Sequence, residues 1–136
     1  MKFVIKGNPI CKKNCMRIVT NRITGRPFLL PSTQFVRFER EAKQYLEPVG
    51  INYPVNVRCV FYMKTKRQVD ITNLLNAIDD ILVTHGVLDD DNRDIVAGHN
   101  GSLVLYDADN PRTEIEITKI EGYEVWSKLK KKKSAR

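Results

Sequence analysis

The stretch from Asp70 to Thr84 constrains the fold most, because its apolar residues recur at the spacing of a helix. The residues that repeat at intervals of three and four are Ile71, Leu74, Leu75, Ile78 and Leu82. This spacing places them on one face of an amphipathic helix and commits that face to a hydrophobic core. Gly86 stands where a glycine commonly ends a helix. We therefore predict a helix over 70–84 that packs against other elements.

Segments typical of strands lie on both sides of this helix. They span residues 2–6, 16–20, 27–30, 55–63, 95–97, 102–106 and 113–119. Ser32 is placed to cap a second helix, whose apolar residues extend to Leu46 before Pro48 and Gly50 end it. This order predicts a single α+β domain, with a mixed sheet and two main helices packed on one face. We expect the domain to span residues 1–122, followed by a basic, flexible tail over 123–136.

Composition favours an intracellular protein. The chain has 136 residues, the usual size of one domain. It contains no apolar run long enough to cross a membrane and no signal-peptide pattern, so we expect a cytoplasmic location and no membrane partner. The three cysteines, Cys11, Cys15 and Cys59, cannot all pair within the chain. Free thiols account for them better than a zinc site, which would need a second pair of ligands.

Charge is distributed unevenly along the chain. The formal net charge is +7, yet residues 70–94 hold seven of the sixteen carboxylates and one base, Arg93. The remaining residues therefore carry a net charge of +13, and six of their bases lie in the tail. This contrast suggests one surface that binds a polyanion and another that holds a cation.

The acidic residues are suited to phosphodiester hydrolysis assisted by a metal. Magnesium binds through a few carboxylates, activates water and neutralises the charge on a leaving oxygen. Asp70 and the turn Asp89–Asp91 could supply such carboxylates, whereas Asp80 would lie about 15 Å along the helix from Asp70. The same residues could instead have simpler roles: Asp70 could only cap its helix, Asp79 and Asp80 could form a solvated helix face, and the turn could be an exposed loop.

The central motif resembles the signature of the RusA-type Holliday junction resolvases. It reads R-x-x-D-I-T-N-L-L-N-A-I-D-D-I-L-x-x-x-G-V-L-x-D-D-N and begins at Arg67. The residues that fall at matching positions are Asp70, Asn73, Asp80, Gly86, Asp90 and Asp91. The strand, basic hairpin and helix that precede the motif are also similar to the family's, so the resemblance extends to about residue 119.

The resemblance implies a homodimer that binds magnesium, or alternatively manganese, and resolves four-way DNA junctions during recombination and repair. It assigns the catalytic metal site to Asp70 and Asp91, with Asp90 beside them. Asn73 and Asp80 would support this site. Two positions depart from the family's pattern, because Thr72 replaces an aspartate and Asn76 replaces a lysine. Thr72 is a poorer magnesium ligand, and Asn76 lacks the charge that would stabilise the transition state.

Basic residues of the N-terminal half are the candidates for binding branched DNA through its phosphates. They are Lys12, Lys13, Arg17, Arg22, Arg26, Lys66 and Arg67. The sequence is compatible with three hypotheses. The chain is a junction-cutting nuclease, or a junction-binding protein that lost the chemistry through Thr72 and Asn76, or a basic structural protein without a preference for junctions.

Overall fold

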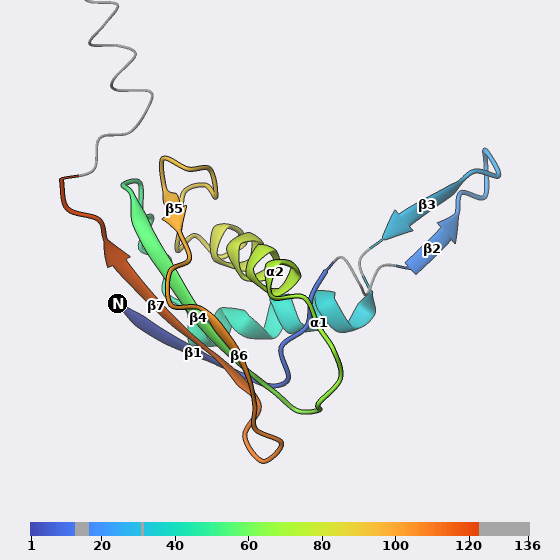
Figure 1. Ribbon diagram of the computed structural model, residues 1–136. Coiled ribbons are helices and arrows are strands. Elements are labelled where there is room, and N and C mark those ends of the chain that lie inside the picture. Colours follow the sequence, from blue (N-terminus) through green and yellow to red (C-terminus); the bar gives the residue numbers. More distant parts are fainter. Residues whose placement is uncertain (13–16, 31, 123–136) are drawn as a thin grey trace, which may run out of the picture.

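The computed structural model describes residues 1–12, 17–30 and 32–122, and for residues 17 and 18 only the backbone. Figure 1 shows a main sheet, two helices and a separate two-stranded hairpin. The strands are β1 (Lys2–Lys6), β2 (Arg17–Thr20), β3 (Pro27–Leu30), β4 (Val55–Met63), β5 (Val96–Gly98), β6 (Leu103–Tyr106) and β7 (Arg112–Lys119). The helices are α1 (Thr33–Ala42) and α2 (Ile71–Thr84), and a short 3-10 helix, η2 (Lys43–Tyr45), follows α1.

The main sheet is mixed and is organised around β4. On one side of β4, β7 pairs with it antiparallel, and β1 pairs antiparallel with the far side of β7. On the other side, β5 pairs parallel with the beginning of β4 and β6 pairs parallel with its end. A parallel pair needs a crossover between its strands, and α2 provides that crossover between β4 and β5.

Both helices cover one face of the sheet, and the core lies between the helices and the sheet (Figure 1). Alternate residues of β4 point to this face and are fully buried: Val55, Val57, Cys59 and Phe61. α2 buries Leu74, Ala77, Ile78, Ile81 and Leu82 against them. The predicted α+β domain, with a mixed sheet and two helices on one face, is therefore confirmed.

Most predicted elements also have the predicted ends. The Ser32 hydroxyl accepts a hydrogen bond from the Phe35 N–H (3.1 Å), which confirms the cap of α1. Gly86 adopts a φ of 74° just after α2, the left-handed conformation that favours glycine there. The predicted strands over 95–97, 102–106 and 113–119 are β5, β6 and β7, with ends that differ by one residue.

The structure also bears on the cysteines and on the search for membrane-spanning helices. Cys11 and Cys59 are free, buried thiols, whereas Cys15 and the tail over 123–136 lie outside the described residues. Within those residues, no helix is long and apolar enough to span a bilayer.

Candidate functional site

Asp70 lies at the start of α2, in the N-cap position. Its backbone carbonyl accepts hydrogen bonds from the N–H groups of Asn73 (3.2 Å) and Leu74 (3.3 Å). Within the described part of the chain, however, its carboxylate makes no capping hydrogen bond. The carboxylate is exposed and lies 3.5 Å from Nδ2 of the buried Asn73. Capping therefore does not account for this side chain, and its oxygens can reach a ligand from solvent.

The turn that follows α2 is exposed and is held together by its own side chains. Asp90 Oδ1 accepts a hydrogen bond from the Asp91 N–H (2.7 Å), and Asp90 Oδ2 accepts one from Asn92 Nδ2 (3.2 Å). Asn92 Oδ1 in turn accepts a hydrogen bond from the Asp94 N–H (2.9 Å). Such local bonds are typical of Asp and Asn in turns. Asp90 thus shapes the turn with both of its carboxylate oxygens.

Asp91 lies among other carboxylates. Partial burial raises the pKa of Asp91, and a hydrogen bond with Asp90 and the negative charges of Asp80 and Asp90 raise it further. Asp80 comes from α2, so the helix and the turn together create this concentration of negative charge. Lys12 Nζ lies 3.9 Å from Asp80 Oδ2 and offsets part of it. A carboxylate whose pKa is raised by neighbouring negative charges would be stabilised in its ionised form by a bound cation.

The predicted metal ligands fall into two places. Asp91 forms a hydrogen bond with Asp90 and lies within electrostatic reach of Asp80, whereas Asp70 contacts Asn73 at the start of α2. Across residues 1–12, 17–30 and 32–122, no three or more His, Cys, Asp or Glu side chains are grouped closely enough to hold a metal ion. The arrangement therefore offers two exposed sets of carboxylate oxygens near α2.

Asp79 corrects one expectation, because it does not belong to a solvated helix face. Its side chain is buried on the inner side of α2, and its Oδ2 lies 2.9 Å from His99 Nε2. The spacing of Leu75, Asp79 and Leu82, four and then three residues, was the signal for this position. The sequence prediction assigned Asp79 to a solvated flank of the helix, although a residue distant in sequence can pair with a buried carboxylate oxygen. The other oxygen, Oδ1, is buried and has no hydrogen-bond partner among the described residues.

His99 bridges α2 and β4 through both of its ring nitrogens. Its Nδ1 lies 2.9 Å from the Val57 carbonyl oxygen, and its Nε2 faces the Asp79 carboxylate, so both nitrogens meet acceptors. Only a doubly protonated ring can donate to both. The hydrogen bond with Asp79 raises the pKa of His99 above its ordinary value, and burial opposes this shift. Burial also raises the pKa of the neighbouring Cys59 thiol, and the charge of Asp79 adds to that effect.

The basic candidates for DNA binding occupy several places. Arg22 and Arg26 are exposed in the turn between β2 and β3, where Asn21 Oδ1 accepts hydrogen bonds from the N–H groups of Ile23 (2.9 Å) and Thr24 (3.2 Å). The exposed loop between β4 and α2 carries two more, Lys66 and Arg67. Lys12 lies beside Asp80. Lys13 and the Arg17 side chain lie outside the described residues.

Comparisons with known proteins add no relative. Neither the models of known protein families nor the curated proteins include a match to this chain.

Proposed function

We propose that this chain is a magnesium-dependent endodeoxyribonuclease that is selective for DNA structure and cuts four-way junctions by paired, symmetric nicks, as in recombination and repair. The observation that carries the proposal is the concentration of negative charge around Asp91, where the charges of Asp80 and Asp90 disfavour ionisation of the Asp91 carboxyl group. Hard divalent cations bind such oxygen ligands and remove the repulsion. The exposed carboxylate of Asp70 would complete the ligand set.

Each residue would then have a defined part. Asp70 and Asp91 would hold the ion, and Asp90 would position Asp91 through the turn that it stabilises. When bound, magnesium would supply an activated water and neutralise the charge on the leaving oxygen. Asn73 would orient Asp70, to which its amide is already directed. Arg22, Arg26, Lys66 and Arg67 would bind phosphates and position the DNA.

A four-way junction also determines the expected assembly. Two opposed strands must be cut at symmetric positions, and this requires two active sites related by a two-fold axis. A homodimer supplies that symmetry. The functional unit would therefore be a dimer of this chain.

A nicking assay on a synthetic four-way junction tests the proposal. Wild-type protein with magnesium should produce paired nicks that a ligase can seal, and Asp91→Asn and Asp70→Asn should each lower the rate at least about 100-fold, because each removes a charged ligand. Asp109→Asn is the matched control, because Asp109 is an exposed aspartate in the turn between β6 and β7. A junction that stays intact at every magnesium and manganese concentration would contradict the proposal.

The two departures from the family's pattern give a second test. Thr72 and Asn76 are both exposed on α2, so substitution there should leave the core intact. Thr72→Asp should raise the nicking rate by restoring a charged ligand near Asp70, and Asn76→Lys should raise it by stabilising the transition state. A lower rate in Thr72→Asp would mean that this chain uses a different ligand set.

A second candidate is a junction-binding protein that does not cut DNA. It is favoured by the absence of a three-ligand group within the described residues. Tight junction binding without nicks would support it, whereas equal affinity for a junction and a linear duplex would indicate a general basic protein. Whether the protein cuts junctions or only binds them, the double change Arg22→Gln and Arg26→Gln should weaken DNA binding. It should also reduce the slope of log affinity against log salt concentration by the amount expected for about two phosphate contacts.

A further inference from the structure

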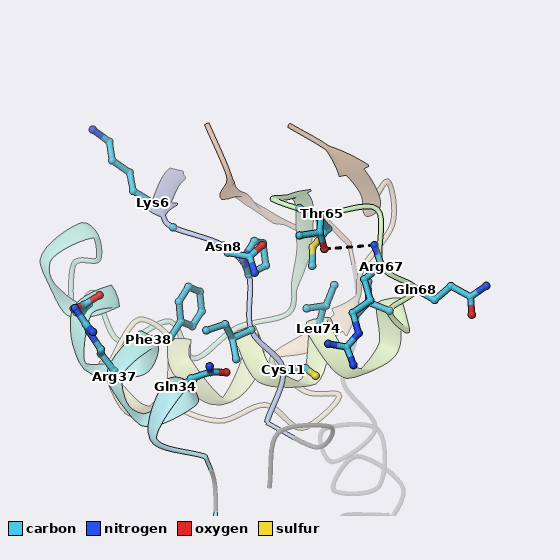
Figure 2. A pocket seen from close by; sticks show the side chains of 16 residues that line it. Lys6, Asn8, Cys11, Gln34, Arg37, Phe38, Thr65, Arg67, Gln68 and Leu74 are labelled. Carbon is cyan, nitrogen blue, oxygen red and sulfur yellow. Dashed lines mark hydrogen bonds and ion pairs between the residues drawn. The ribbon is translucent and has the colours of Figure 1, made fainter. Parts of the chain in front are cut away.

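A pocket of about 640 Å³ opens between α1, the segment that follows β1 and the loop that leads from β4 to α2 (Figure 2). This volume is within the range of sites that hold small organic ligands. Asn8 fastens two of its walls together, because its Oδ1 accepts a hydrogen bond from the Lys64 N–H (2.9 Å). The Gly7 N–H donates to the Pro111 carbonyl oxygen (3.1 Å) and ties the segment after β1 to the residue that precedes β7. The pocket thus has walls fixed by hydrogen bonds between distant segments.

The interior of the pocket is apolar. Phe38 from α1 and Leu74 from α2 point into it in Figure 2, and both are buried. Cys11 is also buried there, and Met63 at the end of β4 is half-buried. A flat apolar group would therefore contact an aromatic ring and aliphatic side chains on entering.

The rim of the pocket is basic and rich in amides. Its charged side chains are three cations, Lys6, Arg37 and Arg67, and one anion, Glu41. Glu41 lies 2.9 Å from Arg37 Nε and offsets that cation, so Lys6 and Arg67 give the rim its positive charge. Figure 2 shows the Arg67 side chain turned toward the interior, whereas Lys6 and Gln68 extend outward. The amides of Asn8, Gln34 and Gln68 add hydrogen-bonding groups around the opening.

We propose that this pocket receives one unpaired deoxynucleotide of the DNA substrate, with its base against Phe38 and Leu74 and its phosphate at the Arg67 guanidinium. An apolar interior suits the face of a base, and a guanidinium at the rim suits a phosphate. The inference rests on the proposed DNA substrate and specifies which part of that substrate the pocket recognises. Asp70 directly follows the pocket residue Val69, so the nucleotide would lie beside a candidate metal ligand.

Methyl NMR tests the pocket directly. The chain has three methionines, Met1, Met16 and Met63, so ¹³C-methyl labelling gives few signals, and Met63→Leu identifies the signal from the pocket. The probe is a short duplex with one unpaired thymidine, and the fully paired duplex is its control. Both are added in EDTA, so that cleavage does not contribute. We expect the Met63 signal to shift with the unpaired thymidine only, and that duplex to bind about tenfold more tightly.

Substitutions of two exposed neighbours, Arg67 and Lys66, distinguish binding in the pocket from general electrostatic attraction to DNA. Arg67→Gln should remove most of the tenfold preference, because Arg67 lines the pocket. Lys66 is not among the residues that line the pocket, and its Nζ lies over the ring of Tyr106 (5.1 Å to its centroid). Lys66→Gln should therefore weaken binding of both duplexes equally. An unchanged Met63 signal, an equal shift with both duplexes, or equal effects of the two substitutions would overturn the proposal.

The outcome also separates this inference from the proposed nuclease. Recognition of the unpaired thymidine without nicking in magnesium would support the pocket and reject the enzyme. Nicking that depends on Asp91 without a Met63 shift would retain the enzyme and reject the pocket.

Discussion

Two adjacent aspartates of α2, Asp79 and Asp80, lie in opposite environments. Asp79 faces inward, where it is buried and paired with His99 from the segment after β5. Asp80 faces outward, where it is about half-exposed, lies 3.9 Å from Lys12 and acts electrostatically on Asp91. One residue of rotation about the helix axis thus separates a carboxylate of the core from a carboxylate of the candidate site.

The difference shows how the fold distinguishes structural charge from charge that is available to a ligand. A buried carboxylate must find a partner within the protein, because desolvation of an unpaired charge is too costly. An exposed carboxylate can lie near other carboxylates, since water screens part of the repulsion. We call Asp79 and His99 the inner pair, and Asp80, Asp90 and Asp91 the outer group.

The largest expected difference between the two regions is in stability. Asp79→Ala should lower the free energy of unfolding by about 3 kcal/mol, because it leaves the partly buried His99 without its carboxylate partner. Asp80→Ala should change it by less than about 1 kcal/mol, because the pair with Lys12 is at the surface. Urea denaturation at neutral pH measures both values. An equal loss of unfolding free energy in the two variants would show that Asp79 contributes no more to stability than Asp80 does.

The second prediction concerns pH and sharpens the assignment of the inner pair. The pKa of His99 is raised in the folded protein, so its protonated form stabilises the fold below its ordinary pKa of about 6.5. This contribution is lost as the pH rises through the folded pKa. The advantage of wild type over His99→Gln should therefore decrease between pH 6 and pH 9, by on the order of 1 kcal/mol.

Urea denaturation of both proteins across this pH range provides the measurement. Asp80→Asn serves as the control, and its difference from wild type should show no such decrease. The Cys59 thiol, whose pKa is raised, should stay protonated throughout the range and should not contribute. An advantage over His99→Gln that stays constant with pH would mean that His99 is neutral.

The smallest expected effect belongs to the outer group. Without metal, Asp91→Asn should raise the free energy of unfolding slightly, by up to about 0.5 kcal/mol, because it removes one of several like charges at an exposed position. Magnesium should raise the melting temperature of wild type by binding the folded state, and it should raise that of Asp91→Asn less. Thermal denaturation with and without magnesium tests this. Identical responses to magnesium in the two proteins would exclude Asp91 as a ligand.

Local patterns in the sequence predicted most of the fold. The hydrophobic repeat of α2, the cap at Ser32 and the alternation over 55–63 depend on neighbours within a few residues, and all three are confirmed. The environment of Asp79 could not be obtained in this way. It depends on His99, twenty residues away in sequence, which the chain brings back to α2 after the turn at Asp89–Asp91.

The candidate site divides along the same line. The sequence by itself determined which carboxylates are concentrated in one stretch, that Asp70 begins a helix and that Asp89–Asp91 lie in an exposed connection after it, because composition and the chemistry of helix ends and loops are local properties. Only the tertiary structure decided that Asp80 and Asp91 interact, that Asp79 is buried, and that Phe38, Leu74 and Arg67 share one pocket. The physical reason is that these relations arise from packing helices on a sheet, which brings together residues that no local spacing connects.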